Sequence, residues 1–364
     1  MSPANPATRI LTIAVRGWCP LFVVALLLAP GAAAAELLLP PGFTAQVYVT
    51  GAGFDSSAAR GVHGIPAAST LAFDHAGALY LARTGRRYFA GEAEDLWPIY
   101  RIPLGGARLT PDTEARFLHG PPLPNPQVAA IRGGREVFVT TFDRDRKVGV
   151  LYRLLDGRPE LFAGGTPWGD APPLLRQPEG AAVDAAGNLY VADREQGLIV
   201  RLDPSGRVRD ARYVSVTRPR VLATDDQDAL WVGSDGTAAA PWQQGVGEIW
   251  KVSREGAPSL VLRGPVPAGI SVGPGGRLFV ADRHLAQIFV VTPDGKRIEF
   301  ARFTDGDAPR GLGFAPVTPE TRRAGIAGDL FVIAIGRGAW PVNEVVRISG
   351  PFDDFVRRHD ASGR

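Results

Sequence analysis

A short apolar motif recurs six times along this chain. Each copy is an aliphatic, an aromatic and a second aliphatic residue that follow a polar turn, and the copies begin at Leu79, Val137, Leu189, Leu230, Leu278 and Leu330. Consecutive copies therefore start 41 to 58 residues apart. A period of about 40 to 50 residues, with several short strands in each period, is typical of β-propellers. We expect an all-β chain that folds as a six-bladed β-propeller.

The third repeat shows the plan of one blade most clearly. Apolar segments at 180–184, 189–193, 198–202 and 208–216 read as strands. The polar segments between them contain glycine, which supplies the positive φ that a tight hairpin needs. The repeat therefore predicts four antiparallel strands, with the innermost strand first.

The sixth repeat lacks a convincing outer strand. Residues 41–49 read like the outer strands of the other repeats and have no blade of their own. Pairing this segment with the sixth blade would close the ring and cover an exposed sheet edge. We therefore expect a propeller over residues 36–351, with 352–364 as a C-terminal tail on its outside.

The first 35 residues have the composition of a secretory signal peptide. Arg9 and Arg16 precede a short apolar run at 21–29, and small residues at Ala33 and Ala35 offer a cleavage site. The run is too short for a permanent membrane helix, although an uncleaved anchor is the alternative. We expect cleavage near Ala35 and a periplasmic or secreted protein without a membrane span.

The composition excludes several classes of function. Cys19 is the only cysteine and lies in the predicted signal peptide, so the mature chain would have no disulfide, thiolate metal site or cysteine nucleophile. Lys and Arg number 40 against 37 Asp and Glu, and two of the arginines belong to the first 35 residues. A nearly neutral mature chain argues against a nucleic-acid partner, which would need clustered positive charge.

Two segments of the chain carry a family resemblance. Residues 177–193 and 266–283 resemble NHL repeats, and the overall plan is similar to the six-bladed superfamily of gluconolactonases, regucalcin-like lactonases and soluble quinoprotein sugar dehydrogenases. Residues 39–43 and 328–347 resemble the glucose/sorbosone dehydrogenase branch. The resemblance implies a propeller that handles a small molecule over its central channel.

Strand direction in such a propeller predicts which residues meet at one face. The beginnings of the inner strands and the ends of the second strands share the face that we call the top. The inner strands begin with Ser69, Gln127, Glu179, Arg220, Ala268 and Arg310, and the second strands end with Arg83, Asp143, Asp193, Asp235, Asp282 and Arg337. Nearby loops carry His63, His119, Trp168, Trp242 and Trp340. Arginines mixed with aromatic residues over a concave centre suit a flat, anionic or polyhydroxylated small molecule.

Glu179 is the strongest candidate, because a carboxylate at the mouth of a narrow channel is costly unless a cation or ligand uses it. His119 is a candidate general base. The candidates for ligand binding are Gln127, Arg220, Arg310, Arg337, Asp193, Asp282, Trp168 and Trp340. Each has a structural alternative: the aspartates can cap turns, the arginines can form ion pairs between blades, and the tryptophans can fill space under their loops.

Three function classes remain open from the sequence. The resemblance to lactonases implies a divalent cation such as calcium on Glu179, but Arg220 and Arg310 stand where further oxygen ligands would be needed. The resemblance to quinoproteins implies pyrroloquinoline quinone held by cationic side chains, with His119 as the base. The third class is a non-catalytic module whose tryptophan loops contact a glycan, a peptide or another envelope partner. The quinoprotein interpretation is slightly preferred on local resemblance.

Overall fold

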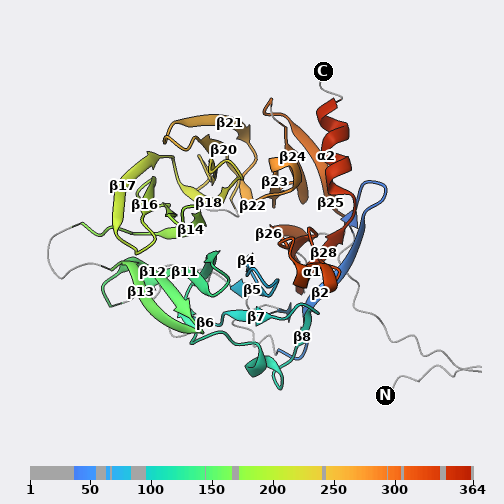
Figure 1. Ribbon diagram of the computed structural model, residues 1–364, viewed down its shortest axis with the longest axis horizontal. Helices are drawn as coiled ribbons and strands as arrows, with labels where there is room; N and C mark the ends of the chain where they lie inside the picture. Colours follow the sequence, from blue (N-terminus) through green and yellow to red (C-terminus); the bar gives the residue numbers. More distant parts are fainter. Residues whose placement is uncertain are drawn as a thin grey trace, which may run out of the picture. The chain divides into compact units, whose positions relative to one another are not determined.

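The computed structural model describes residues 37–54, 63–65, 68–82, 96–143, 145–165, 172–239, 243–292, 294–304, 307–336 and 342–361. The predicted signal peptide lies outside these residues. The chain divides into the units Met1–Ala33 and Ala34–Arg364. The second unit is all-β, and its sheets follow one another around a common axis as six blades (Figure 1). This arrangement confirms the predicted fold class.

Blades two to five each contain four consecutive antiparallel strands, ordered from the axis outward. Blade two has β10 (Gln127–Arg132), β11 (Glu136–Asp143), β12 (Val148–Leu155) and β13 (Arg158–Gly164). Blade three has β14 (Pro178–Val183), β15 (Leu189–Asp193), β16 (Leu198–Leu202) and β17 (Val208–Ser215). Blade four has β18 (Pro219–Thr224), β19 (Leu230–Ser234), β20 (Gly247–Val252) and β21 (Pro258–Gly264). Blade five has β22 (Pro267–Val272), β23 (Leu278–Asp282), β24 (Gln287–Val291) and β25 (Arg297–Phe303), with β1 (Leu37–Leu38) added at its outer edge.

Blade six is completed by the amino-terminal segment, as the sequence predicted. Its own strands are β26 (Ala308–Phe314), β27 (Leu330–Ile335) and β28 (Val342–Ser349), and β2 (Thr44–Gly51) pairs antiparallel with β28 from Thr44↔Ser349 to Val49↔Val345. The two-residue strand β3 (His63–Gly64) also pairs with β28. The ring is therefore closed by hydrogen bonds between the two ends of the propeller.

Blade one differs from the expected four-stranded plan. It has β4 (Thr70–Phe73), β5 (Leu79–Ala82) and β7 (Tyr100–Ile102), whereas β8 (Ala107–Leu109) leaves the blade and pairs in parallel with β2. The outer edge of β7 is instead occupied by 117–119, which exchanges backbone hydrogen bonds with Ile99 and Arg101. A short antiparallel pair joins β6 (Leu96–Trp97), which precedes β7, to β9 (Leu123–Pro124), which precedes blade two in the sequence. Because β8 covers the second edge of β2, the closing strand has a neighbour on both sides.

The repeated aromatic residue holds the same place in every blade. Tyr80, Phe138, Tyr190, Trp231, Phe279 and Phe331 are all buried on the second strand. In five blades a cation stands directly opposite on the third strand, and the pairs are Tyr80↔Arg101, Phe138↔Arg153, Tyr190↔Arg201, Trp231↔Lys251 and Phe331↔Arg347. The ammonium of Lys251, for example, lies 4.9 Å from the centre of the Trp231 ring. The apolar core fills the spaces between neighbouring blades as six separate clusters.

The carboxyl-terminal segment, expected as a tail, contains the helix α2 (Phe352–Ala361). Phe352, Phe355 and Val356 are buried and belong to the apolar cluster between blades five and six. The ring of Phe43 packs edge-on against Phe352 at 4.9 Å between centroids, next to the closing strand. The other helical segments in the described part of the chain are α1 (Pro319–Arg323), η2 (Glu114–Arg116) and η3 (Pro274–Gly276). None of the helices in the described residues is long and apolar enough to cross a membrane.

We expect Val49→Asp to destabilise the propeller by about 3 kcal/mol or more, because it places an unpaired carboxylate between blades six and one. Val49 is fully buried in β2, whereas Val47 on the same strand is 36% exposed. The matched control Val47→Asp should cost less than about 1 kcal/mol. Chemical denaturation measures both. Equal losses for the two variants would contradict the role given to β2 in closure.

Candidate functional site

The inner strands of blades three to six share an irregular register near the point where each strand begins. A proline at the first position of the strand, or at the second position in blade six, pairs with the second strand. The ladder then skips one or two residues before it resumes. The skipped positions hold Glu179, Arg220, Ala268 and Arg310. A β-bulge removes a residue from the ladder and redirects its side chain. The sequence signal for this bulge is a recurring Pro-X dipeptide, at 178–179, 219–220, 267–268 and 309–310. The prediction of the mouth residues did not depend on it.

The bulges also set how closely the blades approach one another. A Cβ atom on Gly180 would lie 2.6 Å from the carbonyl oxygen of Arg220 in the next blade. A Cβ atom on Gly269 would lie 2.4 Å from the carbonyl oxygen of Arg310. Both distances are too short for any side chain, so glycine is required for this contact between inner strands. The narrow channel therefore follows from glycines that stand next to the mouth residues.

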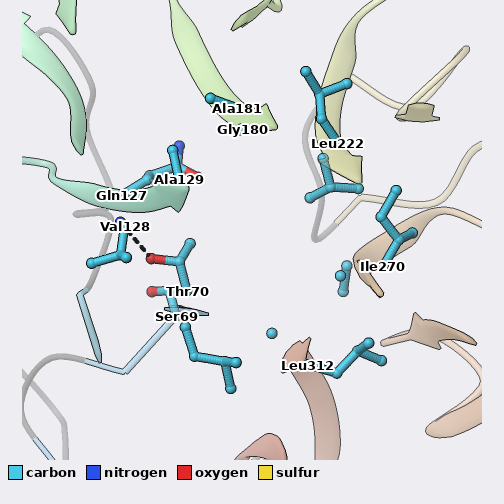
Figure 2. Close-up of a pocket in the computed structure, with 15 residues that line it drawn as sticks. Ser69, Thr70, Gln127, Val128, Ala129, Gly180, Ala181, Leu222, Ile270 and Leu312 are labelled. Carbon is cyan, nitrogen blue, oxygen red and sulfur yellow. Dashed lines mark hydrogen bonds between the residues drawn. The ribbon is translucent and has the colours of Figure 1, made fainter. Parts of the chain in front are cut away.

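A cavity of about 80 Å³ lies among the inner strands of all six blades (Figure 2). Leu222, Ile270 and Leu312 line one side of it, and Ser69 and Thr70 line another. The backbone N–H of Val128 donates to the Thr70 hydroxyl at 3.0 Å across blades one and two. An engineered apolar cavity of about 150 Å³ admits benzene. The channel cavity can therefore take only a small part of a ligand, and the rest would lie at the mouth.

Glu179 is the centre of a buried polar network at this mouth. Its carboxyl group accepts hydrogen bonds from the side-chain amides of Gln127, on blade two, and of Gln177, the latter at 3.0 Å. The hydroxyl of Thr140, on blade two, donates to the Glu179 carbonyl oxygen. Glu179 is only 8% exposed. Burial raises the pKa of its carboxyl group, while the nearby Arg220 guanidinium acts in the opposite direction.

Arg220 extends from its bulge across to blade five. Its Nε donates to Asp235 Oδ1 at 2.7 Å, and its terminal nitrogens donate to the carbonyl oxygens of Pro267 and Ala268. The other Asp235 oxygen accepts from Arg194 Nε at 2.8 Å. Asp235 is fully buried and so joins two guanidinium groups, one from blade three and one from blade four. The sequence analysis placed Asp235 only at the end of a second strand. Its position between two guanidinium groups is a finding of the structure.

Asp193 and Asp282 are buried at the ends of their second strands. Each binds the turn that follows it, and Asp193 also binds the segment that leads into β14. Asp193 accepts hydrogen bonds from the backbone N–H groups of Arg176, Gln177 and Gln196. Asp282 accepts from the backbone N–H groups of His284 and Leu285. These contacts are those of turn-capping residues, the structural alternative that the sequence left open.

The structure does not bring His119 together with Glu179. The His119 ring packs edge-on against Tyr80 at 5.0 Å, beside the outer edge of blade one. Tyr80 in turn reaches Asp74, which follows the end of β4 and so lies away from the mouth. Burial and the charge of Arg101 lower the pKa of the His119 imidazole, which favours its neutral form.

The remaining candidates are only partly described. Arg310 is half-buried at the bulge of blade six. Arg337, Trp168 and Trp340 lie outside the described residues, as do Arg83 and Trp242. Among the residues that are described, no group of three His, Cys, Asp or Glu side chains could hold a metal ion. The assembled site therefore consists of Gln127, Gln177, Glu179, Arg194, Arg220 and Asp235, which we call the mouth cluster.

Solved structures with similar folds cover most of the chain. An auxiliary nutrient binding protein from Bacteroides thetaiotaomicron superposes with a TM-score of 0.54 at 12% sequence identity, over 87% of this chain and 77% of its own. A gluconolactonase from Xanthomonas campestris superposes with a TM-score of 0.52 at 16% identity, over 78% of this chain and 87% of its own. These similarities support the six-bladed fold that the sequence resemblance implied. No family model and no curated protein matches the sequence.

We expect Gly269→Ala to destabilise the protein by about 2 kcal/mol or more, because the new methyl group would collide with the backbone of blade six. Gly105→Ala is the matched control, since a Cβ atom there meets nothing within 4 Å. The control should change stability by less than about 0.5 kcal/mol. Denaturation curves of the two variants test the contact, and an unaffected Gly269→Ala protein would contradict it.

We expect Glu179→Gln to become more stable relative to the parent protein as pH rises. The folded pKa of Glu179 is raised above its ordinary value of 4.5, so the folded state binds its proton more tightly than the unfolded state. The associated stability is complete below about pH 4.5 and is lost as pH rises through the folded pKa. Melting temperatures of both proteins between pH 4 and 8 measure the difference, and a difference that is constant with pH would contradict this account.

Proposed function

We propose that this propeller binds a small polar molecule, sugar-like or anionic, at the mouth of its central channel. The observation that carries the proposal is the buried carboxyl group of Glu179, which accepts hydrogen bonds from Gln127 and Gln177 and lies near Arg220. Neighbouring blades thus contribute side chains to one polar cluster, and its member Gln127 also lines the apolar cavity. Concave sites with a few convergent polar groups and a perturbed pKa are typical of ligand-binding sites.

Buried polar clusters also occur for structural reasons, so the composition of this one matters. An apolar plug would close the channel at lower cost, because buried charges must be desolvated. The mouth cluster instead holds two guanidinium groups, one carboxylate and one carboxyl group with a raised pKa. Burying such a set of groups costs free energy of desolvation, which favours a role for the cluster in binding a ligand.

The described residues do not fit pyrroloquinoline quinone well. A flat tricarboxylate needs cationic groups with free donors facing it. Arg220 directs three of its five N–H groups to Asp235 and to two carbonyl oxygens, and Arg194 is also directed to Asp235. The two N–H groups that remain on Arg220 are enough for one carboxylate but not for three. His119, the base that the resemblance implied, lies on blade one beside Tyr80. The described residues therefore give no support to catalysis by this cofactor.

The described residues do not fit a calcium ion either. A hard cation needs several oxygen ligands. Glu179 is hydrogen-bonded to two amide groups, and the neighbouring Arg220 would repel a divalent cation. The metal-dependent lactonase interpretation is accordingly weaker than ligand binding by the protein's own side chains.

A second candidate function is catalysis with Glu179 as an acid. A carboxylic acid that stays neutral at the working pH can donate a proton to a substrate. The gluconolactonase from Xanthomonas campestris shares the fold, which makes a lactone a reasonable first substrate to test. Hydrolysis of glucono-δ-lactone that is lost in Glu179→Gln would favour this candidate. Binding without turnover would favour a non-catalytic binding module. The similar structure from Bacteroides thetaiotaomicron is named as an auxiliary nutrient binding protein.

Export to the periplasm or to the cell exterior is part of the same proposal. It rests on the features of residues 1–35 in the sequence, and those residues lie outside the described part. Amino-terminal sequencing of the protein from the periplasmic fraction tests cleavage near Ala35. A mature chain that still begins at Met1 would contradict it.

We expect Gln127→Leu to weaken ligand binding at least tenfold, because it removes an amide that touches Glu179 at the mouth. The ligand is first identified by the rise in melting temperature across a panel of sugars, sugar acids, polyols and lactones. Calorimetry then compares the affinity of the parent and the variant. Gln46→Leu, at an exposed position of β2, is the matched control and should bind normally. A panel without any saturable response would overturn the proposed function.

A further inference from the structure

The mouth cluster has an uneven charge balance. Arg194 and Arg220 carry two positive charges, and the single carboxylate between them belongs to Asp235. The side chains of these three residues are 12%, 9% and 0% exposed, so water compensates little of the excess charge. Without Glu179, this part of the cluster therefore has a net charge of +1.

Glu179 is the group that can neutralise this excess. Its carboxyl group feels the fields of Arg220 and Arg194, which favour ionisation, and of Asp235, which opposes it. The ionised form would make the cluster neutral, but burial disfavours a charged carboxylate. The protonated form leaves the positive charge of the cluster uncompensated, which is costly in a buried site.

No other acid among the described residues of this face forms an ion pair with Arg194 or Arg220. Asp193 lies on the strand that pairs with the start of β14, and its carboxylate is bound by three backbone N–H groups and by the Gln196 amide. Asp282 is bound by two backbone N–H groups of its own turn. The cavity below the mouth is lined mainly by apolar residues and contributes no charge.

A ligand anion at the mouth would therefore take the place of the ionised Glu179 as counterion. We propose that the molecule bound at the mouth carries one carboxylate and that its binding is coupled to the uptake of one proton by Glu179. This inference rests on the proposed function and specifies its ligand. On binding, the free carboxylate remains ionised beside Arg220, and Glu179 takes its proton from solvent. The two N–H groups of Arg220 beyond those bound to Asp235 and to the two carbonyl oxygens suit a carboxylate.

The proposal predicts a specific dependence on pH. Above the folded pKa of Glu179, each binding event requires one proton, so the affinity should fall by up to tenfold for each unit of pH. At a pH where Glu179 is already protonated, the affinity should no longer change. A neutral polyol of the same size should bind at least tenfold more weakly and without proton uptake.

Isothermal titration calorimetry of the purified protein tests these statements. The probes are D-gluconate and D-glucuronate, with D-sorbitol and D-glucose as their neutral counterparts. Titrations at pH 5.5, 7 and 8.5, in two buffers with different ionisation enthalpies, give both the affinity and the number of protons exchanged. We expect an acid to bind in preference to its neutral counterpart, with an uptake approaching one proton at high pH.

Two variants separate the role of Glu179 from general damage. Glu179→Gln keeps the shape of the side chain but cannot ionise, so it should bind the acid with an affinity that is independent of pH and without proton uptake. Glu195→Gln makes the same change at an exposed acid that pairs with Arg176, and it should behave as the parent protein. Melting curves of both variants verify that they are folded.

The outcomes are distinguishable. Equal binding of acids and neutral polyols, or binding of an acid without proton exchange, would overturn this inference and leave the proposed function intact. Unchanged proton uptake in Glu179→Gln would also overturn it. Failure of all four probes to bind the parent protein would count against both proposals.

Discussion

The close packing of the six inner strands around one axis is the constraint on which the rest of the structure depends. At Gly180 and Gly269 the backbone of one blade touches the backbone of the next, and a single methyl group would prevent the contact. The bulges beside these two glycines remove Glu179 and Ala268 from the ladder, and the equivalent bulge of blade four removes Arg220. Narrow packing and a polar mouth thus have one local cause, a proline followed by a residue that the ladder skips.

Much of this fold could be predicted from sequence because the repeat places similar residues at similar points. The six aromatic residues are buried on second strands, and the segment 41–49 belongs largely to β2, which closes blade six. The departure of β8 from blade one could not be predicted, because its pairing with β2 depends on an edge that exists only in the closed ring. The helix of residues 352–361 was missed for a related reason. Its apolar residues are few, and their burial depends on Phe43 and Phe300 from distant parts of the chain.

Strand direction indicates where the candidate site lies, but only some of the hydrogen bonds and ion pairs of its residues can be inferred from the sequence. Strand direction predicts that Gln127, Glu179 and Arg220 meet at one face; in the structure Gln127 donates to Glu179, and Arg220 lies near it. The bridge from Arg194 through Asp235 to Arg220 links two blades, and no local pattern reveals such a connection. The sequence analysis placed the His119 loop at the top, whereas in the structure 117–119 runs along the edge of β7. The sequence shows that a charged residue lies near a repeat boundary. For Arg194 the ion-pair partner comes from another blade and is known only once the ring is assembled.

The closing strand has a consequence for how the chain acquires its structure. Thr44 is made early, yet its partner Ser349 is nearly the last residue of the propeller to leave the ribosome. Until then β2 lacks its antiparallel partner β28 and presents an open edge on that side. Contacts between residues so far apart in sequence form slowly. The ring can therefore be completed only after residues 342–349 have been synthesised and both ends of the chain are in the same compartment.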